Sequence, residues 1–141
     1  MTRFGRHAVQ FELTSDRFDH SSVLPADANA GNRFYGRDVA ELLATKLGER
    51  GFDSSFLDED WGWQVHAKRA DSIVLEISIH HNPEEDAARE DDWMLMVRAL
   101  QPGVVLGVIP RVREVELDDG AIDTLVDVFR GEGIELRRAP G

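Results

Sequence analysis

The stretch that decides the fold is residues 61–81, which read WGWQVHAKRADSIVLEISIHH. Two runs inside it, Trp61–Lys68 and Ser72–His81, alternate between apolar and polar side chains, which is the period of a strand with one buried face. A short polar break at Arg69–Asp71 separates the runs and predicts a turn. We therefore predict an antiparallel hairpin with its aromatic and aliphatic residues on the core face. The opposite face carries the polar set: Gln64, His66, Lys68, Glu76, Ser78 and His80.

The remaining elements are predicted from the spacing of apolar residues on either side of this hairpin. Helical spacing predicts two helices, at Tyr35–Arg50 and Asp118–Arg130. Alternation predicts further strands at His7–Leu13, Trp93–Leu100 and Ile134–Arg137. Phe52–Leu57 fits a short strand or an extended link. Two segments stay open: Thr14–Asn32 reads as a long loop with room for two helical pieces, and the glycine-broken Pro102–Pro110 fits either a strand or a loop.

The predicted order is β-α-(β)-β-β-β-α-β. Two helices on one face of a mostly antiparallel sheet define an α+β fold, a two-layer sandwich. The 141 residues suit a single domain, 1–141, that buries its own core. The chain has no cysteine, which excludes disulfides, thiolate metal sites and thiol catalysis.

Charge narrows the class of partner. The chain holds 27 acidic against 16 basic residues, a net charge of −11, and such a field repels nucleic acid and anionic membranes. Lys46 and Lys68 are the only lysines, and this preference for arginine favours a GC-rich bacterial genome. The start of the chain shows no apolar signal segment. We therefore expect a bacterial, cytoplasmic protein that binds neither nucleic acid nor membrane.

The most distinctive motif is the acidic and aromatic run at residues 58–63. Asp58, Glu59 and Asp60 precede Trp61 and Trp63, which flank a glycine. An aromatic surface with an acidic rim suits a cation, an arginine side chain or a sugar. The same run also fits the start of a strand whose tryptophans point inward while the acids face solvent.

A resemblance accompanies this motif. Asn32-Arg33-Phe34-Tyr35-Gly36-Arg37, followed by Glu59-Asp60-Trp61-Gly62-Trp63, resembles a group of small uncharacterised bacterial proteins. The similarity covers roughly the first two thirds of the chain. The resemblance implies the order of strand, helix and acidic-Trp-Gly-Trp strand. It points to no particular enzymatic activity.

A second candidate site combines histidines with a carboxylate. His66, Glu76 and His80 share the polar face of the predicted hairpin, so they are weak candidates for a metal site or for acid–base catalysis. His81 points to the opposite face, and no metal-binding motif supports the idea. A polar sheet face with half-exposed histidines, or a pH-sensitive contact, fits the same residues.

The third candidate is an acidic loop at Pro83–Asp92. A docking surface for a basic partner fits its composition, as does a solvated loop between two strands. Its acidic residues are Glu84, Glu85, Asp86, Glu90, Asp91 and Asp92.

These patterns favour a non-enzymatic, immunity- or inhibitor-like domain. It would bind a basic protein through the acidic residues of 58–60 and 84–92, with Trp61, Trp63 or Trp93 at the centre. One alternative is a small metal-binding or hydrolytic enzyme using His66, Glu76 and His80. Another is a small-molecule-binding protein with a pocket reached through Thr14–Asn32. We predict no cofactor, and the sequence does not indicate an oligomeric state or the role of the apolar stretch Val104–Ile109.

Overall fold

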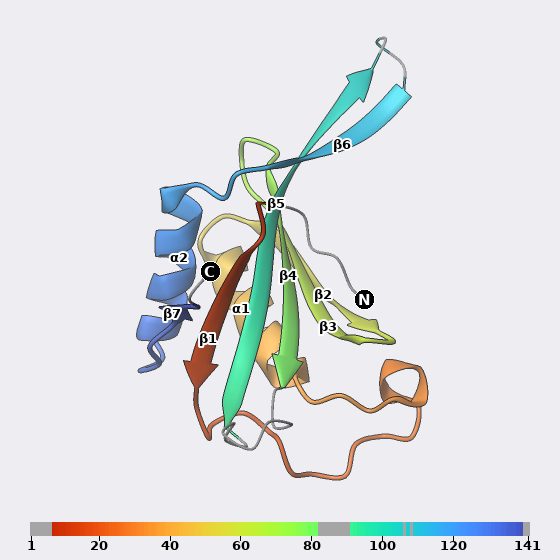
Figure 1. Ribbon diagram of the computed structural model, residues 1–141, viewed down its shortest axis with the longest axis vertical. Helices are drawn as coiled ribbons and strands as arrows, with labels where there is room; N and C mark the ends of the chain where they lie inside the picture. The colour runs from red at the N-terminus through yellow and green to blue at the C-terminus, as the bar shows by residue number, and fades with distance from the viewer. Residues whose placement is uncertain (1–6, 82–90, 106, 108, 140–141) are drawn as a thin grey trace.

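The computed structural model describes residues 7–81, 91–105, 107 and 109–139 (Figure 1). It contains an antiparallel sheet and two helices, which confirms the predicted α+β class. The helices are α1 (Arg37–Glu49) and α2 (Asp119–Arg130), and a short 3₁₀ turn, η1, covers Ala28–Gly31. The strands are β1 (Val9–Thr14), β2 (Asp53–Glu59), β3 (Gly62–Lys68), β4 (Val74–His81), β5 (Asp92–Val105), β6 (Ile109–Val115) and β7 (Arg137–Arg138).

The predicted hairpin is confirmed as β3–β4. Val65 lies opposite Ile77 and His66 opposite Glu76, so the alternation in the sequence corresponds to the two faces of the sheet. The path across the sheet is β2-β3-β4-β5-β1-β7. The remaining strand, β6, pairs with β5 and has no counterpart in the predicted order, because the sequence pattern assigned no element between Pro102 and the start of the second helix.

One face of the sheet forms the core. Its buried strand residues alternate along the chain: 11 and 13 on β1, 63, 65 and 67 on β3, 75, 77 and 79 on β4, and 93, 95, 97 and 99 on β5. The buried residues of both helices join them in a single cluster. The apolar stripe of α1 packs on the β2 and β3 end of the sheet. The largest fully buried side chains from the sheet and helices include Trp93, Phe11, Phe129, Leu43 and Ile77.

The two halves of β5 have different neighbours. Its first half, Asp92–Val97, pairs with β1, whereas Ala99–Val105 pairs with β6 along the same edge. The pairing with β4 ends at Leu100. Beyond that point β5 and β6 continue as a two-stranded arm, which projects away from the body of the molecule (Figure 1). We refer to the described residues 101–105 and 109–113 as the arm.

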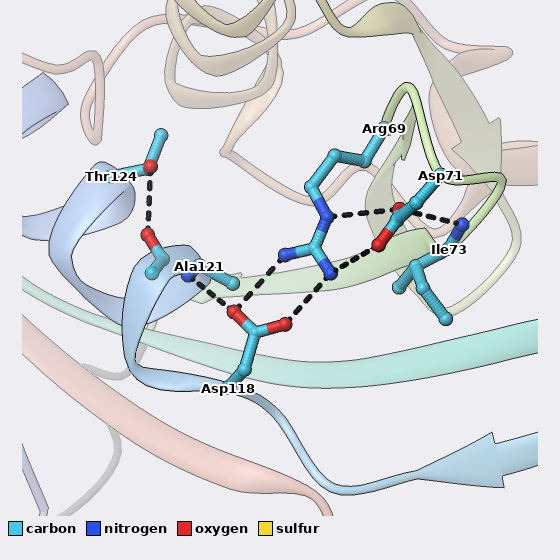
Figure 2. A network of polar contacts seen from close by, with 7 residues as sticks. Arg69, Asp71, Ile73, Asp118, Ala121 and Thr124 are labelled. Carbon is cyan, nitrogen blue, oxygen red and sulfur yellow. Dashed lines mark hydrogen bonds and ion pairs between the residues drawn. The ribbon is translucent and has the colours of Figure 1, made fainter.

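The start of α2 is fastened to the β3–β4 turn by a charged network (Figure 2). Arg69 donates hydrogen bonds to both oxygens of Asp71 and to both oxygens of Asp118, at 2.7–3.0 Å. Asp118 is also the N-cap of α2, since it accepts from the backbone nitrogen of Ala121 at 2.8 Å. These bonds to Arg69 lower the pKa of both carboxyl groups.

Candidate functional site

The described residues form an open cleft of about 460 Å³. It lies between the long loop that follows β1, the first turn of α1 and the end of β2. A volume of this order lies within the roughly 300–1,000 Å³ of ligand sites. We call this feature the acidic cleft. Its lining residues are Asp19, Leu24, Pro25, Asp27, Ala28, Phe34, Tyr35, Gly36, Arg37, Asp38, Glu41, Asp58 and Trp63.

Asn29 holds the outer wall of the acidic cleft in place. Asn29 is only 1% exposed. Its Nδ2 donates to Asp58 Oδ1 and to the carbonyl oxygens of Glu59 and Gly62, each at 2.9 Å. Its Oδ1 accepts from the backbone nitrogen of Phe34 at 2.8 Å. Asn29 also adopts a left-handed backbone conformation with φ of 52°, which asparagine tolerates better than most residues. The loop is thereby fastened to the β2–β3 turn.

The inner wall depends on a close approach of α1 to the sheet. Gly36, at the N-cap of α1, has φ of 134°, and a Cβ there would lie 3.1 Å from Trp63 Cδ1 and 3.2 Å from Ile79 Cγ2. Trp63 donates from Nε1 to the carbonyl oxygen of Phe34 at 2.9 Å. Glycine is therefore required where the helix begins, and the two motifs at 32–37 and 58–63 contact each other in space.

The acidic cleft carries five carboxylates and one arginine on its lining. Asp19 accepts from the hydroxyl of Ser22, and from the backbone nitrogens of Ser22 and Ser21, and these bonds lower its pKa. Asp38 Oδ2 accepts from the backbone nitrogen of Asp19 at 2.8 Å. These two carboxylates therefore hold the loop against α1, and the lowered pKa keeps Asp19 ionised at neutral pH.

Two other carboxylates of the cleft are available to a ligand. In the described part of the chain, the exposed side chains of Asp27 and Glu41 form no hydrogen bond or ion pair. The cleft's arginine, Arg37, places its guanidinium 5.9 Å from the centre of the Phe56 ring. Phe34, at 42% exposure, adds an aromatic surface to the cleft. The negative potential of the cleft is therefore only partly compensated, beside an exposed ring.

The predicted acidic and aromatic motif is divided by the structure. Asp58 lines the acidic cleft, whereas the side chains of Glu59 and Asp60 are not among its lining residues. Trp63 touches the acidic cleft but is only 6% exposed, and Trp93 is buried, so neither offers a broad ring surface to a partner. Trp61 is 37% exposed on the other face of the sheet, where its ring lies 5.7 Å from that of His80.

The predicted histidine and carboxylate set is also divided. His66 Nε2 lies 3.7 Å from Glu76 Oε2, and Arg98 Nε donates to Glu76 Oε1 at 2.7 Å. His80 instead packs beside Trp61, and partial burial lowers its pKa. Across the described residues no three histidines, aspartates or glutamates are grouped as a metal site would require. Glu76 therefore neutralises an arginine, and the three predicted residues do not form one centre.

The predicted acidic loop is only partly described. Glu84, Glu85, Asp86 and Glu90 lie outside the described residues. Asp92 accepts a hydrogen bond at Oδ1 from the Thr14 hydroxyl at 2.7 Å, and the carbonyl oxygen of Asp91 accepts from Ser15 N. These two residues connect the start of β5 to the end of β1.

Sequence reasoning missed most of the acidic cleft. Asp19 and Asp27 lie in the loop that follows β1, whereas Asp38 and Glu41 lie on α1, and no motif in the sequence connects the two pairs. The length of Thr14–Asn32 was the available signal, because long loops in compact domains are commonly functional.

Comparisons with known proteins returned no matching family model, curated protein or solved structure. Among the described residues, neither helix has the length and apolar character needed to cross a membrane.

Proposed function

We propose that the protein is a non-enzymatic interaction domain, of the immunity- or inhibitor-like kind, that binds a basic protein through its acidic cleft. The observation that carries this proposal is the cleft itself, with five carboxylates, one arginine and the exposed ring of Phe34. A concave surface of one charge sign attracts and orients a partner of opposite sign.

The chemistry of the cleft favours arginine side chains of the partner. A guanidinium group pairs with two carboxylate oxygens at once and stacks on an aromatic ring, whereas a lysine ammonium group does neither as well. Asp27 and Glu41 supply uncommitted carboxylates, and Phe34 supplies the ring. The net charge of −11 increases the rate of encounter with any basic surface.

The test is a calorimetric titration with oligoarginine, with oligolysine as comparison. We expect the double variant Asp27→Asn/Glu41→Gln to weaken oligoarginine binding about tenfold or more, a change equivalent to ~1.4 kcal/mol. The matched control is Glu116→Gln/Asp123→Asn, which removes the same charge from exposed positions that do not line the cleft.

Two outcomes would contradict the proposal. In one, the cleft variant binds oligoarginine as tightly as the native chain does. In the other, the control variant loses as much affinity as the cleft variant, which would mean that net charge alone governs binding. Binding of small guanidinium compounds as tightly as the peptide would instead favour a small-molecule-binding protein.

A further inference from the structure

The arm is the feature of the fold that the proposed function leaves unexplained. Within the described residues, Gln101–Val105 pairs with β6 alone, and β6 pairs with β5 alone. A two-stranded ribbon without a further layer is marginally stable in water. Val112 on β6 is 61% exposed, and the chain between 104 and 109 is apolar in sequence. An arm of this kind gains stability when another surface covers it.

The charge of the arm is opposite to that of the whole chain. Between residues 101 and 113 the only charged side chains are Arg111 and Arg113, although the chain carries −11 overall. Both arginines are exposed, and they lie on one face of β6 because they are two positions apart. Their Cα atoms are therefore about 7 Å apart, so two guanidinium groups are presented side by side.

Arg113 and Arg111 differ in how they are held. Arg113 Nη2 donates to Gln101 Oε1 at 2.7 Å, which orients its guanidinium along the arm. Arg111 forms no hydrogen bond or ion pair with the rest of the described chain. The arm thus presents two guanidinium groups, one oriented and one uncommitted. The two uncommitted carboxylates of Asp27 and Glu41 equal them in number and are opposite in charge.

The arm cannot reach the cleft of its own chain. It projects from one end of the molecule, whereas the loop that walls the acidic cleft lies at the opposite end (Figure 1). We propose that the arm of one copy binds in the acidic cleft of a second copy, with Arg111 and Arg113 facing its carboxylates. This inference rests on the proposed function, because it assigns an occupant to the same cleft.

The placement of arm and cleft at opposite ends also sets the arrangement of the copies. Two molecules lying side by side with their long axes antiparallel bring each arm to the other's cleft, which closes a two-fold dimer with two identical contacts. Direct pairing of β6 with a second β6, centred on Val112, would instead place Arg111 opposite Arg113 of the other copy. Like charges in that position are destabilising.

The experiment is sedimentation velocity on two charge-reversed variants, alone and mixed. The arm variant is Arg111→Glu/Arg113→Glu, and the cleft variant is Asp27→Arg/Glu41→Arg. We expect the native chain to self-associate as its concentration rises, and each variant alone to remain a monomer. An equimolar mixture restores both contacts, because the acidic arm meets the basic cleft while the native arm meets the native cleft.

A control separates this contact from the effect of net charge. Arg50→Glu/Arg130→Glu changes the net charge by the same amount as the arm variant, at exposed positions outside the arm and the cleft lining, and we expect it to retain self-association. Circular dichroism shows whether each variant is folded.

The inference is overturned if the native chain stays monomeric, if both variants associate as the native chain does, or if the mixture fails to associate. Failure of the inference is distinguishable from failure of the proposed function. If the inference alone fails, the folded arm variant still binds oligoarginine in its native cleft.

Discussion

Replacement of Asn29 by alanine tests how the walls of the acidic cleft are held together. The two hydrogens of Nδ2 are shared among three oxygens at 2.9 Å, and Oδ1 accepts one further bond. Alanine therefore removes about three hydrogen bonds, each worth about 1 kcal/mol net, and leaves buried backbone groups without partners. Alanine at a φ of 52° adds about 1 kcal/mol of backbone strain.

The expected loss is about 4 kcal/mol, a large part of the roughly 5–15 kcal/mol that stabilises a domain of this size. Urea unfolding followed by tryptophan fluorescence measures it. Asn29→Gly lacks the backbone strain and should lose about 3 kcal/mol. The matched control is Asn32→Ala, since exposed Asn32 makes a single side-chain bond to the carbonyl oxygen of Asp60, and should lose about 1 kcal/mol or less. Equal losses for Asn29→Ala and Asn32→Ala would refute the reasoning.

Three further predictions concern the elements around the cleft and the sheet. Gly36→Ala should lower the free energy of unfolding by about 2 kcal/mol or more, because the new methyl group meets Trp63 and the backbone conformation is strained; thermal unfolding measures this. Asp118→Ala should cost about 1–2 kcal/mol through loss of the α2 cap. Arg69 lowers the pKa of Asp118, so the native chain should also lose stability as the pH falls below the ordinary aspartate value of 3.8. Asp118→Ala should lose less stability below that pH, and unfolding curves measured at a series of acidic pH values would show the difference. Burial lowers the pKa of His80, so the unfolded chain binds more protons and stability should fall as the pH drops below 6.5; His80→Gln should flatten this dependence in urea unfolding curves measured at several pH values.

The sheet was predictable wherever one face is buried and the other is not. In Trp61–Lys68 and Ser72–His81 the alternation specifies which face meets the core, and a slip of one residue would reverse every side chain. The helix at Arg37–Glu49 was predictable for the same reason, because its apolar residues recur at the period of a buried helical stripe.

The strand β6 was not predictable in this way. The arm has no core to face, so its residues show no alternation that reports burial, and Gly103, Gly107 and Pro110 interrupt the pattern. The last strand was expected at Ile134–Arg137 and is observed at Arg137–Arg138, because Ile134 and Leu136 pack into the core before the chain pairs with β1.

The acidic cleft is a tertiary feature, and this explains why the sequence concealed it. Asn29 lies 29 residues from Asp58, and only the folded loop brings the two together. Sequence reasoning selected Asp58 for its place in an acidic run, but had no basis for joining it to Asp27 or Glu41. The histidine hypothesis placed His66, Glu76 and His80 on one sheet face. Alternation in the sequence predicts the face of a residue but not its neighbours, so it could not predict that Arg98 donates a hydrogen bond to Glu76.

The most direct test of the central claim is to locate the binding of a basic peptide on the chain. Two-dimensional ¹⁵N–¹H nuclear magnetic resonance spectra, recorded during titration with oligoarginine, report which backbone amides change. We predict that the changes concentrate at Asp19–Glu41 and at Asp58, around the acidic cleft. Changes concentrated instead on the exposed face of α2, or spread evenly over all acidic surfaces, would contradict the account.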